Sequence, residues 1–119
     1  MGEVLPKPAI ADSLAGHEVY DATIGGLLRE VAARIPDTEA LVEGRPHGTA
    51  GHRWTFAEMR VDSERLAAGL ASRFRSGERI AVWAPNVPEW VLLEYAAALA
   101  GLTLVTVNPS YQARDWRST

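Results

Sequence analysis

Cysteine is absent from the 119 residues, and lysine occurs only once, at Lys7. The absence of thiols excludes disulfides, thiolate catalysis and cysteine-based zinc sites, and it fits a reducing cytoplasm, the location we expect. The net charge of −3 offers no surplus of positive charge for holding phosphates, so nucleic acid is not an expected partner. Hydrophobic content of 47% with 23% charged residues is that of an ordinary globular protein, and the length suits one domain.

An uninterrupted membrane-spanning run is also missing. The longest apolar stretch, residues 90–107, approaches the roughly 20 residues of a spanning helix and holds Glu94 as its only charge. Gly101 divides it, however, and the β-branched residues at 103–107 favour a strand. We therefore expect a helix followed by a buried strand and no membrane span.

What is present begins with a helical pattern between Thr23 and Pro36. Thr23 is a plausible N-cap, and Pro36 cannot continue the hydrogen-bond ladder of a helix. The apolar residues of one face recur at helical spacing: Ile24, Leu27, Leu28, Val31, Ala32 and Ile35. This pattern predicts an amphipathic helix packed along that face.

A hairpin and a second helix are predicted next. Short strands at residues 40–42 and 54–56 flank a loop at residues 44–53, which is rich in glycine and proline. Thr55 and Glu58 have the spacing of a capping box, so we expect a helix from there to about residue 74, ended by Ser76 and Gly77. Its predicted buried face contains Met59, Leu66, Ala67, Leu70, Ala71 and Phe74.

The last third predicts a strand, a helix and a strand at residues 79–83, 87–100 and 103–107. Asn86 is the expected N-cap of this helix, and Gly101 suits the left-handed position after its end. Such a unit makes its strands parallel with a right-handed crossover. The predicted fold class is therefore α/β.

Candidate chemistry along the chain is weak. The turn at residues 84–88 has two prolines and no glycine, which argues against a dinucleotide-binding domain, and no GxxxxGK[ST] loop occurs. His47 and His52 have no third metal ligand close in sequence. Glu89 and Glu94 are better explained as a capping carboxylate and a surface residue than as an acid/base pair.

Three tryptophans, Trp54, Trp83 and Trp90, could stack on bases or line a pocket, but their positions favour core packing. From the residues alone we therefore predict no catalytic, cofactor-binding or metal-binding residue in this chain.

The motif at residues 79–90, RIAVWAPNVPEW, with TVNP at 106–109, resembles the adenylate-forming enzymes. Within them it is most similar to the fatty-acid and medium-chain acyl-CoA synthetases, and the likeness extends over about residues 20–114. The resemblance implies an N-terminal fragment of the large domain, with a β-hairpin, helices and one parallel βαβ unit. We accordingly expect a flexible segment at 1–20, a partial AMP-binding-type domain at 21–114 and a truncated tail at 115–119.

The resemblance also implies a reaction for the full-length enzyme. A fatty acid would attack the α-phosphate of ATP, and coenzyme A would then displace AMP to give the thioester, with Mg²⁺ as a further cofactor. In the family, the phosphate-binding groups come from a Ser/Thr/Gly-rich loop ending in lysine and from a second lysine in a mobile C-terminal domain. Neither has a counterpart here, since Lys7 lies outside the region of resemblance. We expect the chain alone to be inactive and to hold no cofactor.

Other hypotheses remain open. An early stop, a frameshift or an incomplete gene model would each explain why the chain ends where family members continue. A non-enzymatic α/β module that needs a partner chain to complete its sheet is the main alternative, and open sheet edges would also permit self-association. A small dinucleotide-binding domain is the third hypothesis.

Overall fold

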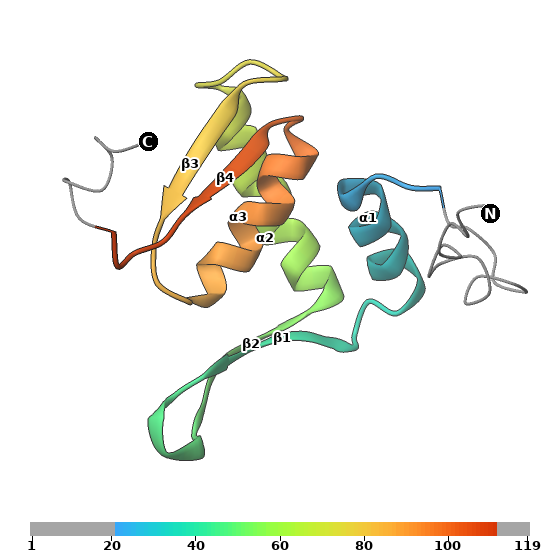
Figure 1. Ribbon diagram of the computed structural model, residues 1–119. Helices are drawn as coiled ribbons and strands as arrows, with labels where there is room; N and C mark the ends of the chain where they lie inside the picture. Colours follow the sequence, from blue (N-terminus) through green and yellow to red (C-terminus); the bar gives the residue numbers. More distant parts are fainter. Residues whose placement is uncertain (1–20, 112–119) are drawn as a thin grey trace, which may run out of the picture.

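The computed structural model describes residues 21–111, and within them the chain is an α/β structure with an antiparallel hairpin and a parallel strand pair, which confirms the predicted fold class (Figure 1). The predicted segments 1–20 and 115–119 lie outside the described residues. In chain order the elements are α1 (Ile24–Arg34), β1 (Glu39–Gly44), a 3-10 turn η1 (Pro46–Gly48), β2 (Ala50–Thr55), α2 (Phe56–Ala71), β3 (Arg79–Trp83), α3 (Pro88–Leu99) and β4 (Thr103–Val107).

Helix α1 begins and ends as predicted. The Thr23 hydroxyl accepts a hydrogen bond from the Gly26 amide at 3.0 Å, and the helix ends at Arg34, before Pro36. Its buried face is narrower than expected. Leu28 and Ala32 are buried, whereas the flanking residues Ile24, Leu27 and Ile35 are exposed. The helix packs against α2 and α3 along one line only, so the rest of the apolar face is left uncovered within residues 21–111.

The β1–β2 hairpin is longer than the sequence predicted. The second strand begins at Ala50 rather than Trp54, because residues 50–53 pair antiparallel with β1. The loop is correspondingly shorter, and Phe56 is the first residue of α2 rather than the last of the strand. Alternation of apolar residues is too weak in this strand for periodicity to reveal it.

Helix α2 has the predicted capping box. The Thr55 hydroxyl accepts from the Glu58 amide at 3.2 Å, and the Glu58 carboxylate accepts from the Thr55 amide at 2.8 Å. Its buried residues are Met59, Ser63 and Ala67, which are four apart and pack toward α3. The helix ends at Ala71, and the prediction that Leu66, Ala71 and Phe74 are buried is wrong: all three are exposed.

The βαβ unit is confirmed: β3 and β4 pair in parallel, with Arg79 opposite Thr103 through to Trp83 opposite Val107. Gly101 has a φ of 72°, the left-handed position expected after α3. The Asn86 cap is wrong, because Val87 is the N-cap residue and makes no side-chain cap bond. Pro88 occupies the first turn, where its missing N–H leaves one amide fewer to satisfy.

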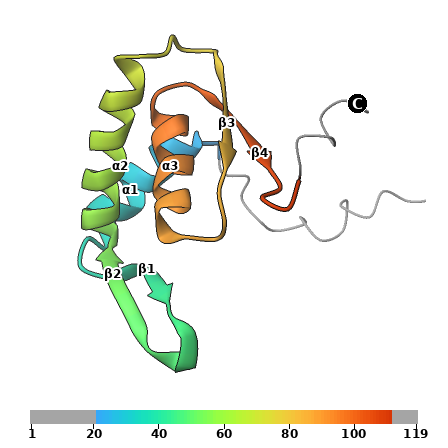
Figure 2. The ribbon, with the colours of Figure 1, turned by 90° about the vertical axis from the view of Figure 1, so that its left-hand side faces the viewer.

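The core lies where the hairpin meets the helices. Leu28, Trp54, Met59 and Leu92 form the buried cluster, which joins α1, β2, α2 and α3. Helices α2 and α3 lie on one side of the β3–β4 pair (Figure 2). Among residues 21–111, no helix is long and apolar enough to cross a membrane.

Candidate functional site

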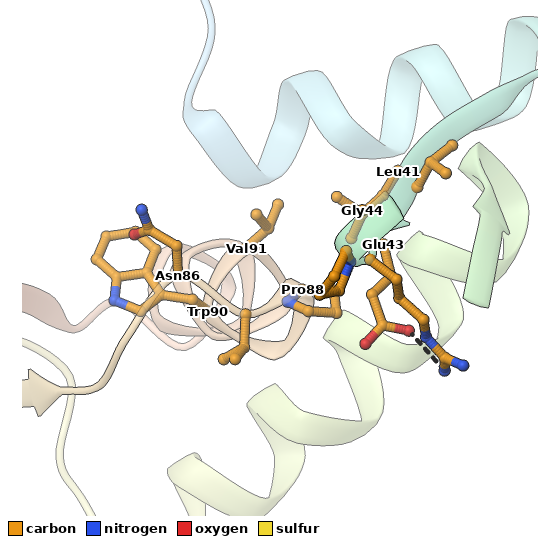
Figure 3. A pocket seen from close by; sticks show the side chains of 11 residues that line it. Leu41, Glu43, Gly44, Asn86, Pro88, Trp90 and Val91 are labelled. Atoms are coloured by element: carbon orange, nitrogen blue, oxygen red, sulfur yellow. Dashed lines mark hydrogen bonds and ion pairs between the residues drawn. The ribbon is translucent and has the colours of Figure 1, made fainter. Parts of the chain in front are cut away.

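A groove of about 530 Å³ lies between the hairpin and the start of α3 (Figure 3). Strand β1 and its turn form one wall and the N-terminal turn of α3 the other. Asn86 and Trp90 lie toward one end of the groove, and Glu43 toward the other. The lining is Leu41, Val42, Glu43, Gly44, Arg45, Pro46, Asn86, Val87, Pro88, Trp90 and Val91.

The charged groups of this groove are already paired. The Glu43 carboxylate accepts the His52 backbone N–H at 3.1 Å and the Arg45 guanidinium at 3.2 Å. These two partners, the His52 amide first, lower the pKa of Glu43 below its ordinary value, so it is ionised at neutral pH. A paired carboxylate is a poor general base at pH 7. The groove can therefore accommodate apolar groups, but its side chains offer no evident acid/base pair.

The three tryptophans considered as site residues differ in burial and in their contacts. Trp54 is buried in the core as predicted, and its indole N–H donates to Asp62 at 3.0 Å, while the ring meets His52 edge to face at 4.1 Å. Trp90 is half-buried and lines the groove. For Trp83, the prediction of core packing is wrong: it is 59% exposed, because its side of β3 is uncovered within the described residues.

The histidines and glutamates considered as site residues are not brought together. His47 lies in the hairpin turn with φ of 65°, whereas His52 lies on β2. Glu89 and Glu94 are both exposed on α3. Within residues 21–111 there is no group of three His, Asp or Glu side chains that could hold a metal ion.

Two features escaped sequence reasoning. The groove joins residues 41–46 to residues 86–91, and no local pattern indicates that these segments meet. The Trp54–Asp62 bond crosses a strand–helix junction, with Asp62 on the second turn of α2. The capping box could have signalled it, because fixing the start of α2 also fixes which of its side chains face the end of β2.

The family model described as AMP-binding enzyme matches residues 28–118, most of the chain. A medium-chain acyl-CoA ligase from Danio rerio, named ACSF2, mitochondrial, is 42% identical over 103 residues, which are 86% of this chain and 16% of that protein. A putative acyl-CoA synthetase of Bacillus subtilis, YngI, is 35% identical over 99 residues, or 82% of this chain and 17% of that protein.

Solved structures agree. The inhibitor-bound N-terminal domain of FACL13 from Mycobacterium tuberculosis has a TM-score of 0.68 at 30% identity, covering 81% of this chain and 23% of that domain. The chain therefore belongs to the AMP-binding enzyme family, as a fragment of the acyl-CoA synthetase type. It spans about 16% of the length of the curated relatives it matches.

Proposed function

We propose that this chain is the N-terminal structural part of an ATP-dependent acyl-CoA synthetase and is inactive alone. The complete enzyme would join a fatty acid to coenzyme A, with cleavage of ATP to AMP and pyrophosphate and with Mg²⁺ as cofactor. The observation that carries this proposal is the match to acyl-CoA ligases over 86% of this chain but 16% of the relative. The division into an N-terminal segment at 1–20, a partial domain at 21–114 and a tail at 115–119 is part of the same proposal.

The inactivity is supported by the chemistry of the described residues. No lysine occurs between residues 21 and 111, so the chain has no ammonium group there to offset charge on a phosphoryl oxygen. Pro85 in the turn before α3, and Pro88 as the first residue of α3, remove backbone donors where a phosphate would need them. The groove beside this turn holds a paired Glu43 and otherwise mostly apolar side chains.

ATP–pyrophosphate exchange tests this part of the proposal. The purified 119-residue chain is incubated with ATP, Mg²⁺, labelled pyrophosphate and fatty acids of several lengths. We expect exchange at the level of a protein-free control. Exchange that depends on both the chain and the fatty acid would show that the chain catalyses adenylation and would overturn the claim of inactivity.

A second candidate is a non-enzymatic module that completes its sheet with a partner chain, and self-association through open edges is its simplest form. Its support is that β3 and β4 pair only with one another among residues 21–111, so each has a free outer edge. Sedimentation velocity over a hundredfold range of concentration tests the self-association. A single monomer boundary at every concentration would argue against it.

The location is also part of the proposal. We propose the cytoplasm, on the support of a cysteine-free chain. Fractionation of cells that express the tagged chain tests this. Recovery with mitochondria, the location printed in the names of the animal relatives, would overturn it.

A further inference from the structure

The loop between α2 and β3, residues 72–78, lies at one end of the molecule, at the top of Figures 1 and 2. Every residue of this loop is exposed. Its backbone is nevertheless held in place, because the Gly77 amide donates to the Gly101 carbonyl at 2.8 Å. The Thr103 amide donates in turn to the Glu78 carbonyl at 2.9 Å. The loop therefore presents its side chains from a backbone that is fixed to the turn between α3 and β4.

The arginines of this region differ from the others in their ion pairing. Every arginine between residues 29 and 65 forms a salt bridge with a carboxylate. Arg73, Arg75 and Arg79 form none with the described part of the chain, and all three are exposed. Three guanidinium groups within seven residues are thus available to a negatively charged partner.

An aromatic side chain lies among these cations. Phe74 stands between Arg73 and Arg75 and is 39% exposed. The single carboxylate of the loop, Glu78, accepts the Arg75 backbone N–H at 2.7 Å. The three arginines and this one glutamate give a net charge of +2, in a chain whose net charge is −3. Residues 73–79 are called here the arginine patch.

A bilayer with anionic headgroups fits both parts of the arginine patch. Its phosphate groups can pair with the guanidinium groups, while the Phe74 ring enters the boundary between headgroups and acyl chains. Nucleic acid fits less well, because the net charge of −3 over the whole chain opposes binding along a polyanion. A protein partner would have to match the shape of the surface over roughly 800 Å², whereas a bilayer requires only that the loop lie at an end of the molecule.

We infer that the arginine patch is the surface through which this chain associates reversibly with an anionic membrane. Each basic residue near such a membrane strengthens binding about fivefold, so a net charge of +2 gives roughly a 25-fold preference for anionic over neutral bilayers. The preference is electrostatic, so salt weakens it. This inference concerns association alone and does not depend on the proposed ligase activity.

Co-sedimentation with vesicles tests the inference. The purified 119-residue chain is mixed at low salt with vesicles of phosphatidylcholine, or of phosphatidylcholine and phosphatidylglycerol in equal amounts. We expect the second kind to bind roughly 25-fold more tightly, and the double variant Arg73→Gln/Arg75→Gln to lose that preference. The matched control is Arg34→Gln/Arg65→Gln, which removes the same charge from two exposed but ion-paired arginines and should leave most of the preference intact.

A fluorescent label reports which end of the molecule meets the bilayer. The chain has no cysteine, so Ser72→Cys places one environment-sensitive dye beside the arginine patch. Ala50→Cys places the same dye at the start of β2, in the hairpin at the other end of the molecule (Figure 1). Anionic vesicles should raise the emission of the dye at residue 72 and leave that at residue 50 unchanged.

Several outcomes would overturn the inference. These are equal binding to both kinds of vesicle, equal loss of binding in the two double variants, and a response at residue 50 as large as that at residue 72. Soluble polyglutamate is the remaining arm of the test. Binding of polyglutamate without binding of vesicles would assign the arginine patch to an acidic polypeptide and would exclude the membrane as its partner.

Discussion

The two strand pairs of this protein satisfy their side chains in different ways. In the antiparallel hairpin, Arg53 pairs with Glu39 and Arg45 with Glu43, while Trp54 is buried in the core, with Ala40 and Leu41 packed against it. In the parallel pair, both sides are largely apolar, and the side with Trp83 and Val105 lies open within residues 21–111. The hairpin thus has one solvated side and one side packed on the core, whereas both sides of the parallel pair are largely apolar.

This difference reflects how far along the chain the segments lie that cover the faces of each strand pair. An antiparallel hairpin can leave one face in water, so neighbouring residues and the helix that follows are sufficient. A parallel pair needs helices on both faces, and here one crossover helix supplies one of them. Local segments therefore cover the apolar side of the hairpin, whereas one side of the β3–β4 pair has no covering element among residues 21–111.

The largest expected effect contrasts two tryptophans. Trp54→Ala should destabilise the chain by about 3–5 kcal/mol, because it opens a cavity in the core and leaves Asp62 without its indole partner. Trp83→Ala should change the unfolding free energy by less than about 0.5 kcal/mol, since the side chain is exposed. Urea unfolding followed by circular dichroism measures both. Equal losses would mean that the side of the β3–β4 pair with Trp83 is already covered in the isolated chain.

Two glycines, one on α1 and one on α2, test how closely the helices pack. A Cβ on Gly25 would lie 2.8 Å from Leu99 Cδ2, so Gly25→Ala should displace the Leu99 side chain or the end of α3 that carries it, at about 1–3 kcal/mol. Gly69 on α2 has no atom within 4 Å of such a Cβ, and Gly69→Ala should stabilise by up to about 1 kcal/mol through helix propensity. Thermal melts of the two variants should therefore shift in opposite directions. A stabilising Gly25→Ala would contradict the close approach of α1 and α3.

The starts of α2 and α3 differ in their caps. Thr55→Ala removes a side-chain cap and should cost about 1 kcal/mol. Asn86→Ala should have almost no effect, because the α3 cap is Val87 and it makes no side-chain bond. Chemical denaturation of both variants checks this. A loss of stability in Asn86→Ala as large as that in Thr55→Ala would mean that Asn86 caps α3 after all, as the sequence predicted.

The smallest expected effect is a pH dependence in the hairpin. Because the folded-state pKa of Glu43 is lowered, its stabilising contribution is present above its ordinary pKa of 4.5 and is lost as the pH falls through the lower folded value. Glu43→Gln should therefore be less stable than the unmodified chain at pH 7, and the gap should close below pH 4.5. Denaturation midpoints at a series of pH values test this, and a constant gap would contradict it.

Much of the fold could be predicted because its signals are local. Thr23, the Thr55–Glu58 capping box and Gly101 each act within one helical turn, and all three were confirmed. The βαβ unit was predicted for the same reason, since its strands and helix lie within about 30 residues.

Apart from the Asn86 cap, which is a local miss, the main differences arose where residues far apart in the chain decide the outcome. Residues 50–53 became a strand because β1 lies beside them, and Trp83 is exposed because burial depends on what packs against a side chain. The sequence by itself determined the helices, the caps of α1 and α2, the parallel pair and the family. Only the tertiary structure decided the groove at Glu43 and Trp90 and the exposure of Trp83 on β3. Hydrogen-bond geometry is fixed over a few residues, whereas burial is settled by segments that meet from far apart in the chain.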